Sequence, residues 1–359
     1  MKQNLTLVTS HPIGTGIYRV LENYANLGFY DCYYYFNSIN DNRTNISQKP
    51  MYKEVAPSHL PSKLAFALSF NLDGTWTKVL RNSDCVHILE PGFFHLSKFG
   101  IPIIGTIHDL YPLENDPKNV YSHIYKHFYK KDMWYIENLL GINTISKETS
   151  IILNKFFPNV KTKVIHHWTS NYFTVKDKLT CRDKLSLPRS KFILLNVSFK
   201  SGNKNLEFLG SVIDSLNDDF LLIHIGPVAV QASNSNRVKN ITNFFDDSNL
   251  VALYNAADLY LAPSTSEGFN IPIIEAINCG LPVIASDIPV FREILFSSPY
   301  ILPLRTELWV SNIFSLTDRS IMKEAISWYS SNIGDYYREN RGKREFMDYF
   351  VSLGILKDS

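Results

Sequence analysis

The sequence predicts an α/β protein in which two parallel-sheet domains follow one another along the chain. Short apolar runs alternate with helix-like stretches through both halves of the 359 residues, and this alternation is typical of parallel strands joined by helical crossovers. A chain of this length is long for one core and comfortable for two domains of ordinary size. We therefore expect two Rossmann-like halves, with ligands bound beyond the carboxyl ends of their strands.

In the first half, apolar runs predict strands and the stretches between them predict helices. The expected strands are LTLVT, YYYF, VHILE, IPIIGTIHD and INTIS, and the expected helices cover residues 17–26 and about 121–140. After Lys163, the string KVIHHWTSNYF predicts a strand that runs into an irregular stretch. The mixed-charge segment KDKLTCRDKLSLPRSK follows, so the first domain is expected to span residues 1–170.

The second half repeats the alternation. Its expected strands are FILLNVS, FLLIHIG, LYLAP, PVIAS and YILPL, with helices that begin near Asn205, Asn249, Pro272 and Pro289. The aromatic-rich stretch from Ser320 onward is expected to be helical. We assign residues 171–335 to the second domain and residues 336–359 to a last helix.

Composition excludes several classes of protein. Hydrophobic residues make up 45% of the chain and the net charge is +2, so the excess of positive charge that nucleic acid binding requires is missing. The four cysteines lack metal-ligand spacing and are expected to be reduced packing residues. The N-terminus predicts a strand rather than a signal peptide, and no window approaches the roughly 18 apolar residues needed to cross a bilayer. A cytoplasmic location is expected.

The most informative segment is PSTSEGFNIPIIEAINCGLPVIAS, residues 263–286. It follows an apolar strand, tightens at Gly268 and becomes helical from about Pro272, which suits a first-turn position because proline has no N–H to leave unpaired there. The free N–H groups and the positive end of the helix dipole make an anion site suited to a diphosphate. Glu267 and Glu275 bracket this turn, and such carboxylates can accept hydrogen bonds from the hydroxyls of a sugar and of a ribose. Taken alone, Glu275 fits an ordinary first-turn helix acid equally well.

The same segment resembles the donor-binding motif of family 4 of the retaining GT-B glycosyltransferases, the glycosyl transferases group 1. The matching positions are Pro263, Ser264, Glu267, Gly268, Phe269, Pro272, Glu275, Ala276, Gly280, Pro282, Val283, Ala285 and Ser286. Asn270 departs from a common second glycine, and asparagine tolerates the left-handed backbone that the loop needs. The resemblance implies that Glu267 contacts the donor sugar, that Glu275 holds the ribose, and that the amides of Phe269, Asn270 and Ile271 hold the phosphates. It also implies the GT-B architecture, in which two Rossmann-like domains face a cleft and the last helix crosses back to the first domain.

Lys204 follows the predicted strand FILLNVS, where the family has a lysine that neutralises the diphosphate. A cation near a helix start is disfavoured by the dipole, which favours a ligand-binding role for Lys204 over plain solvation. Ser198 replaces the family glycine, while Phe199 and Asn203 stand where an arginine is common. We assign Lys200 as the substitute for this missing charge.

Two loops of the first half are further candidates. Gly14 and Gly16 follow the first strand and let the backbone approach a ligand, as in the loop that the family closes over the donor phosphates, although a plain tight turn is the alternative. The third glycine of a dinucleotide fingerprint would fall at Arg19, which disfavours a nicotinamide or flavin cofactor. His108 ends the strand IPIIGTI, and the resemblance implies that it contacts the transferred sugar; Asp109 either orients it or caps the next turn.

The resemblance places the nucleotide base at residues 243–245, around Phe244, and leaves uracil and guanine open. The acidic pairs Asp218-Asp219 and Asp246-Asp247 are more simply turns or helix starts than metal ligands. The spacing of His166-His167 is wrong for a helical metal pair. We therefore expect neither a metal nor a cofactor.

The sequence thus predicts transfer of a hexose-like sugar from a UDP- or GDP-sugar to an acceptor hydroxyl, with retention of configuration as the resemblance implies. The candidate catalytic residues are His108, Lys204 and Glu267. The alternatives are a nucleotide-sugar epimerase of the same fold and an inactive sugar-nucleotide-binding protein, which the missing arginines suggest. A glycan, a lipid-linked or a small-molecule acceptor stays open, as does peripheral membrane contact through a basic face at residues 126–131.

Overall fold

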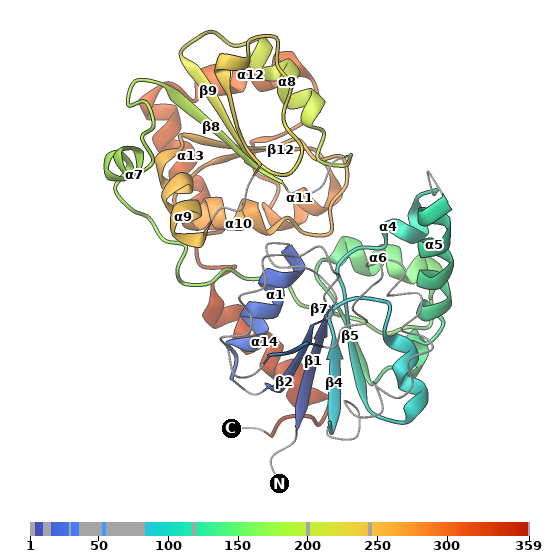
Figure 1. Ribbon diagram of the computed structural model, residues 1–359. Helices are drawn as coiled ribbons and strands as arrows, with labels where there is room; N and C mark the ends of the chain where they lie inside the picture. Colours follow the sequence, from blue (N-terminus) through green and yellow to red (C-terminus); the bar gives the residue numbers. More distant parts are fainter. Residues whose placement is uncertain are drawn as a thin grey trace. The chain divides into compact units, whose positions relative to one another are not determined.

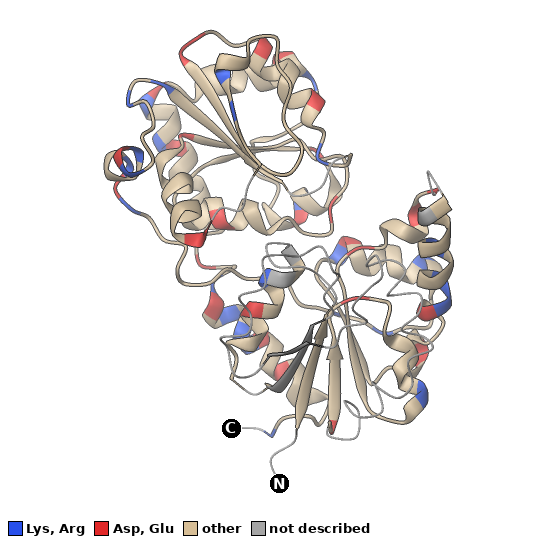
Figure 2. Ribbon diagram, in the orientation of Figure 1, with Lys and Arg blue, Asp and Glu red and all other residues tan. Residues whose placement is uncertain are grey.

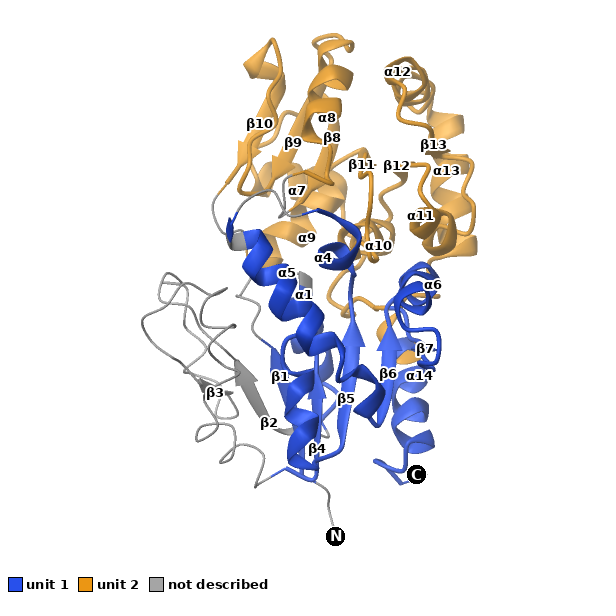
Figure 3. Ribbon diagram, turned by 90° about the vertical axis from the view of Figure 1, so that its right-hand side faces the viewer, with its two compact units in different colours: residues 1–166, 342–359 blue, residues 167–341 orange. Residues whose placement is uncertain are grey.

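The chain forms two compact units in the computed structural model. One comprises Met1–His166 with Gly342–Ser359, and the other comprises His167–Arg341 (Figure 3). The structure describes residues 4–9, 16–28, 30–35, 52–54, 83–116, 120–198, 202–242 and 246–357. The two divisions lie a few residues from the predicted boundaries at 170 and 335.

The first unit is built on a parallel sheet with the strand order β3-β2-β1-β4-β5-β6-β7 (Figure 1). Its strands are β1 (Leu5–Thr9), β2 (Tyr30–Tyr35), β3 (Tyr52–Glu54), β4 (Cys85–Ile88), β5 (Ile103–Ile107), β6 (Gly141–Thr144) and β7 (Lys163–Val164). Every residue of β1, β4 and β5 is buried, as expected for strands that are covered on both faces. Because the chain runs outward from β1 to β3 and then returns to β4, the strand order reverses between β1 and β4.

Helices and short 3-10 turns connect these strands. They are α1 (Gly16–Ala25), η2 (Phe94–Phe99), α4 (Tyr111–Glu114), α5 (Val120–Met133), η3 (Ile136–Asn138) and α6 (Lys147–Phe156). The helix predicted over residues 121–140 ends earlier, at Met133, so its predicted C-terminus is wrong. Near that end the buried Asp132 carboxylate turns inward and accepts the N–H groups of Phe94 and His95, both at 3.0 Å, which holds the first turn of η2.

The C-terminal helix α14 (Glu339–Ser352) packs against the first unit through two phenylalanines. The ring of Phe346 lies 4.3 Å from that of Tyr24 and 5.6 Å from that of His87, and the ring of Phe350 also lies 5.6 Å from His87. The final stretch, predicted to be helical, forms α13 (Arg319–Asn332) and α14, and the chain turns between them at Gly334, close to the predicted start of the last helix at residue 336. The predicted crossing of the last helix back to the first domain is confirmed.

His87 links four strands of this sheet through a buried chain of hydrogen bonds. Thr106 Oγ1 donates to Asn143 Oδ1 at 2.8 Å, so it must accept from His87 Nε2 at 2.7 Å. The other ring nitrogen, Nδ1, then accepts from the Tyr30 hydroxyl at 2.7 Å. Both ring contacts are therefore satisfied by the neutral Nε2–H tautomer. Burial and, to a smaller extent, the nearby His108 lower the pKa of His87 from 6.5 to about 3.

We expect the free energy of unfolding to decrease as the pH falls below 6.5, because the unfolded chain protonates His87 there and the folded chain does not. At pH 4.5, two units below the unfolded pKa, His87 alone should remove about 2.7 kcal/mol. Urea unfolding at pH 7.0 and pH 4.5 measures this loss. Between pH 7.0 and pH 4.5, the free energy of unfolding should decrease less in His87→Gln than in the wild type. In the control His123→Gln, which changes an exposed histidine, it should decrease as much as in the wild type. An equal loss in wild type and His87→Gln would contradict the assignment.

The second unit contains a parallel sheet with the order β10-β9-β8-β11-β12-β13. Its strands are β8 (Phe192–Val197), β9 (Phe220–Ile225), β10 (Val238–Ile241), β11 (Leu259–Ala262), β12 (Val283–Ser286) and β13 (Ile301–Leu302). Its other elements are α7 (Lys178–Lys184), α8 (Leu206–Asp214), η4 (Ser235–Arg237), α9 (Asp247–Ala256), α10 (Ile271–Asn278), α11 (Pro289–Ile294), α12 (Thr306–Ser315) and α13. Helices α8 and α12 pack together on one face of the sheet, and α9 and α10 pack together on the other (Figure 1).

The mixed-charge segment before β8, predicted to be an irregular boundary, contains the helix α7. Asp177 caps this helix by accepting the Thr180 N–H at 2.8 Å. Arg182 is buried, pairs with Asp258 at 2.6 Å and donates to the carbonyl of Ala256 at 2.9 Å. The prediction of a domain boundary in this segment therefore missed α7. Its charged side chains hold the helix against the C-terminal end of α9 and the start of β11. Cys85, Cys181 and Cys279 are unpaired and buried, which agrees with the packing role expected for them.

Candidate functional site

The candidate site lies where the strand order of the second sheet reverses. β8 comes first in this unit, its neighbours are β9 and β11, and the chain passes to the far side of β8 when it enters β11. Loops that leave such adjacent strands diverge and form the crevice in which open α/β sheets bind ligands. Hydrogen bonds join the loops that follow β8 and β11: Thr265 N donates to the Asn203 carbonyl at 2.8 Å, and Asn203 Nδ2 donates to the Ser266 carbonyl at 2.7 Å.

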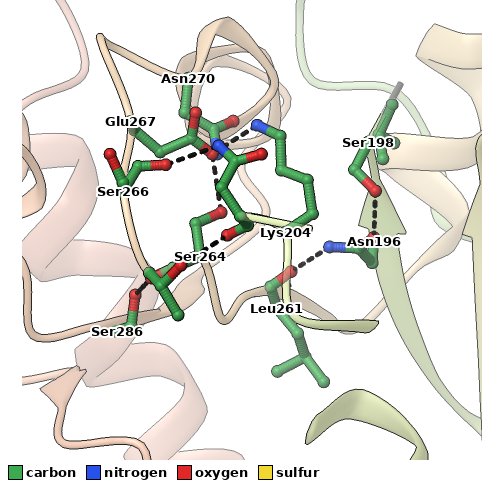
Figure 4. A network of polar contacts seen from close by, with 12 residues as sticks. Asn196, Ser198, Lys204, Leu261, Ser264, Ser266, Glu267, Asn270 and Ser286 are labelled. Carbon is green, nitrogen blue, oxygen red and sulfur yellow. Dashed lines mark hydrogen bonds and ion pairs between the residues drawn. The ribbon is translucent and has the colours of Figure 1, made fainter. Parts of the chain in front are cut away.

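Glu267 is the centre of the site (Figure 4). Its Oε1 atom forms an ion pair with Lys204 Nζ and accepts hydrogen bonds from Ser264 Oγ at 2.7 Å and from Asn270 Nδ2 at 2.9 Å. The Glu267 side chain is 8% exposed and that of Lys204 is 15% exposed, so the pair is largely withdrawn from water. The structure thus brings together the two predicted catalytic residues of this unit, which lie 63 positions apart in the sequence.

A second layer of polar contacts holds the strand ends behind Glu267. Ser286 Oγ donates to the Ser264 carbonyl, and Asn196 Nδ2 donates to the Leu261 carbonyl at 2.8 Å, which links β8 to β11 (Figure 4). Asn196 Oδ1 lies 2.8 Å from His224 Nδ1. Burial lowers the pKa of His224, and its hydrogen bond to the Val228 carbonyl offsets part of that shift.

The sequence analysis did not single out Asn196 or His224. Each is a polar residue within an apolar predicted strand, and this was the signal that could have revealed them.

The loop between Glu267 and α10 leaves several amide groups without partners. Phe269 is buried, with its ring 5.4 Å from that of His167 and 5.6 Å from that of Tyr337, and it anchors the loop. Pro272 lies in the first turn of α10, and no side chain caps the helix. The N–H groups of Gly268, Asn270 and Ile271 donate no hydrogen bond to any residue in the described ranges. These donors and the helix dipole suit a phosphate group.

Glu275 lies inside the unit rather than on its surface. The residue is 2% exposed, and its Oε2 accepts a hydrogen bond from the Tyr254 hydroxyl of α9 at 2.8 Å. The alternative for Glu275, an ordinary first-turn helix acid, does not fit, because Glu275 is the fifth residue of α10 and its buried carboxylate requires partners. Tyr254, which lies in α9, was not among the predicted site residues.

The other predicted site residues belong to the first unit or fall outside the described ranges. His108 directly follows β5 and is 8% exposed. Asp109 Oδ1 accepts the Tyr111 N–H at 3.2 Å, which is the turn-capping role among the two considered for it. Gly16 is the first residue of α1. Three further predicted site residues lie outside the described residues, namely Gly14, Lys200 and Phe244.

The acidic pairs have structural partners, as predicted. Asp246 caps α9 by accepting the Asn249 N–H at 2.9 Å, and Asp218 lies 3.7 Å from Arg237. Within the described ranges, no cluster of three or more His, Cys, Asp and Glu side chains is arranged to hold a metal ion. No helix in the same ranges combines the length and the apolarity needed to cross a bilayer.

Comparisons with known proteins give a family match within the unit that carries this site. Residues 177–297 fit the family model described as glycosyl transferases group 1. The serotype-specific mannosyltransferase WbdA of Escherichia coli is 26% identical over 214 residues, which cover 54% of this chain and 26% of WbdA. The O-antigen chain mannosyltransferase RfbU of Salmonella typhimurium is 38% identical over 92 residues, which cover 25% of each chain. The matches thus span about a quarter of the length of these relatives.

Solved structures resemble the chain over nearly its whole length. Sucrose-phosphate synthase from Thermosynechococcus elongatus has a TM-score of 0.79 at 17% identity and covers 98% of this chain and 99% of its own. Anabaena Alr3699/HepE, crystallised with UDP and glucose, has a TM-score of 0.77 at 16% identity and covers 98% of this chain and 100% of its own. At such identities the likeness shows the fold alone, and it confirms the predicted fold class. The chain therefore has the GT-B fold, and its residues 177–297, which include Lys204, Glu267 and Glu275, match the family model of the glycosyl transferases group 1.

Proposed function

We propose that this protein transfers a hexose-like sugar from a nucleoside-diphosphate sugar to an acceptor hydroxyl, with retention of the anomeric configuration. The observation that carries the proposal is the meeting of Lys204 and Glu267 beside the uncapped start of α10. A cation and free amides suit the diphosphate, and a carboxylate next to them suits the sugar hydroxyls. The family match over residues 177–297 supports the same chemistry.

In the proposed reaction, the bond between the anomeric carbon and the β-phosphate oxygen breaks and negative charge develops on that oxygen. Lys204 and the amides of Gly268, Asn270 and Ile271 would stabilise this charge, and preorganised donors of this kind each contribute about 10²–10³ in rate. Because Lys204 is paired with Glu267 in the absence of ligand, the incoming diphosphate has to attract the ammonium group away or share it. Glu275 would hold the ribose, with the Tyr254 hydroxyl as a positioning group.

We propose that retention proceeds by substitution on the same face of the sugar. In this proposal Glu267 binds hydroxyls of the sugar, so it does not act as a covalent nucleophile. The departing phosphate oxygen would instead take the proton of the acceptor hydroxyl as the new glycosidic bond forms. Lys204 and the helix start would supply the positive charge that a divalent metal supplies elsewhere, so we propose that the reaction needs no metal. His108 would contact the transferred sugar.

Nucleotide release from a panel of donors tests the function. The panel contains UDP-glucose, UDP-N-acetylglucosamine, GDP-mannose and ADP-glucose, with and without EDTA, and NMR of the product gives the anomeric configuration. Both relatives are mannosyltransferases by name, and one is named for the O-antigen chain. These names favour mannose as the sugar and a growing glycan chain as the acceptor. Release with one donor, unaffected by EDTA, supports the proposal. An epimerised donor without nucleotide release would identify the epimerase alternative, and calorimetric binding without turnover would identify the inactive one.

We further propose that the first unit contacts an anionic membrane surface through the exposed face of α5 in the cytoplasm. This face carries His123, Ile124, His127, Lys130 and Lys131, and Trp134 follows the helix with 77% of its surface exposed. The lysines of α5 are blue in Figure 2. Lys126, included in the predicted basic face, is instead held by the Asn115 carbonyl at 2.8 Å. Lysine charge and an exposed tryptophan favour the headgroup region of a membrane.

Sedimentation with phosphatidylglycerol vesicles tests this contact, with phosphatidylcholine vesicles as the neutral comparison. Each lysine near an anionic surface contributes about 1 kcal/mol, so Lys130→Ala/Lys131→Ala should weaken binding to the anionic vesicles roughly 30-fold. Lys161→Ala/Lys163→Ala removes two exposed lysines from the same unit and should leave binding unchanged. The proposed binding to an anionic membrane surface would be excluded if the wild type sedimented equally with both lipids or with neither.

A further inference from the structure

Asn270 occupies the N-cap position of α10 but does not cap the helix. An asparagine at this position ordinarily accepts the N–H of the second or third helical residue through its side-chain oxygen. Here the Ile273 N–H bonds to the backbone carbonyl of Asn270 at 3.1 Å, and the Asn270 side chain makes no capping bond. The backbone of Asn270 is left-handed, with φ 82° and ψ 72°, a conformation that costs less for glycine. Helix capping therefore does not explain this residue.

The Asn270 side chain points instead toward Glu267 (Figure 4). Its Nδ2 atom donates to Glu267 Oε1 at 2.9 Å. This hydrogen bond fixes the orientation of the amide and leaves Oδ1 as the side-chain acceptor. Oδ1 is buried and accepts no hydrogen bond from any residue that the structure describes. A buried acceptor without a partner costs free energy, and native proteins retain such groups where they have a use.

Glu267 presents a second acceptor beside it. The three donors around Glu267 all meet at Oε1, namely Lys204 Nζ, Ser264 Oγ and Asn270 Nδ2. No side chain or backbone group of the described residues donates to Oε2. Because Asn270 Nδ2 donates to the same carboxylate, Glu267 Oε2 and Asn270 Oδ1 are two acceptors on one hydrogen-bonded pair of side chains. Two adjacent hydroxyl groups of a sugar ring are the complementary donors.

We infer that Asn270 Oδ1 accepts a hydrogen bond from a hydroxyl of the donor sugar next to the hydroxyl that Glu267 binds, and that Asn270 is thereby a specificity-determining residue. This inference rests on the proposed function and adds to it a chemical class of sugar. A vicinal diol satisfies both acceptors. A sugar in which the second hydroxyl is replaced by hydrogen or fluorine leaves Oδ1 without a donor.

Calorimetry of nucleotide and nucleotide-sugar binding tests the inference with UDP, GDP, UDP-glucose and GDP-mannose. The sugar contribution is the ratio of the Kd for the nucleotide to the Kd for the nucleotide-sugar. In Asn270→Gly this ratio should fall about fivefold, the value of one neutral hydrogen bond, while the Kd for the nucleotide alone changes less than about twofold. Ser186→Gly is the matched control, because it also replaces a left-handed residue of the same unit, with φ 51°, away from the site.

Monodeoxy analogues of the accepted sugar identify the hydroxyl. One analogue should weaken binding to the wild type about fivefold and leave binding to Asn270→Gly unchanged, which is the result of a double-mutant cycle for a direct contact. Glycine suits the left-handed backbone, so the variant should have a Tm at or above that of the wild type.

Three results would overturn the inference: an unchanged sugar ratio, equal sensitivity of both proteins to every deoxy analogue, or a lower Tm that assigns Asn270 a structural role. A wild type that gains no affinity from any sugar contradicts the proposed function itself, and the inference with it. A wild type that discriminates among sugars while Asn270→Gly does so equally well contradicts the inference alone.

Discussion

Lys204→Ala is expected to lower kcat/KM for glycosyl transfer by about 10³-fold, because it removes the cation nearest to the developing charge on the leaving diphosphate. The effect should appear mainly in kcat, since the charge grows as the bond to the sugar breaks. Initial rates of nucleotide release at varied donor concentration give both constants.

Lys323→Ala is the matched control for this variant, because Lys323 is an exposed lysine on α13 of the same unit. Lys204→Ala also leaves the largely buried Glu267 carboxylate with two neutral donors, which should cost roughly 1–3 kcal/mol of stability after allowance for its partial exposure. The Tm of each variant separates this cost from the catalytic loss. If a folded Lys204→Ala kept a kcat within about threefold of the wild type, Lys204 would have no electrostatic role.

Glu267→Ala is expected to lower kcat/KM by about 10²-fold or more, because it removes both the acceptor for the sugar hydroxyl and the anchor that positions Lys204. Glu267→Gln keeps the size of the side chain and an acceptor oxygen, so its loss should be smaller. The exposed Glu324→Ala on α13 serves as the control. Assays with the donor identified by the panel measure all three variants.

A variant with both substitutions tests whether Lys204 and Glu267 contribute to the reaction together or independently. If Lys204 and Glu267 act as a unit, Lys204→Ala/Glu267→Ala should lose much less than the product of the single losses, since residues that act together are strongly non-additive. Its Tm should also recover relative to Lys204→Ala, because the uncompensated carboxylate is gone. Losses that multiply would show that the ion pair seen in the absence of ligand plays no part in the reaction.

Local patterns were enough to predict most of the architecture. The apolar runs that became β8, β9, β11 and β12 are short, continuous and bounded by turn residues, and each is buried, so composition alone identified them. The helix α7 was missed because its charged residues indicated a solvated boundary. Arg182 is nevertheless buried against Asp258, a contact 76 positions away that no local window contains.

In the candidate site, too, some features follow from local sequence and others from long-range contacts. The chemistry of residues 263–286 and the position of Lys204 after a strand follow from residue types at fixed spacing, because strand ends, helix starts and the hydrogen-bonding capacity of a carboxylate are local properties. The sequence by itself therefore determined which groups the second unit offers to a ligand, namely free amides, a cation and carboxylates.

Only the tertiary structure decided how these groups are paired. The placement of β11 beside β8 brings Glu267 to Lys204, the packing of α9 against α10 buries Glu275 under the Tyr254 hydroxyl, and the bond to Glu267 sets the orientation of the Asn270 amide. Each of these outcomes depends on contacts between residues that are distant in the chain or on the geometry of a closed loop. Burial and hydrogen-bond direction arise when elements pack, and a pattern of residue types along the chain does not specify them.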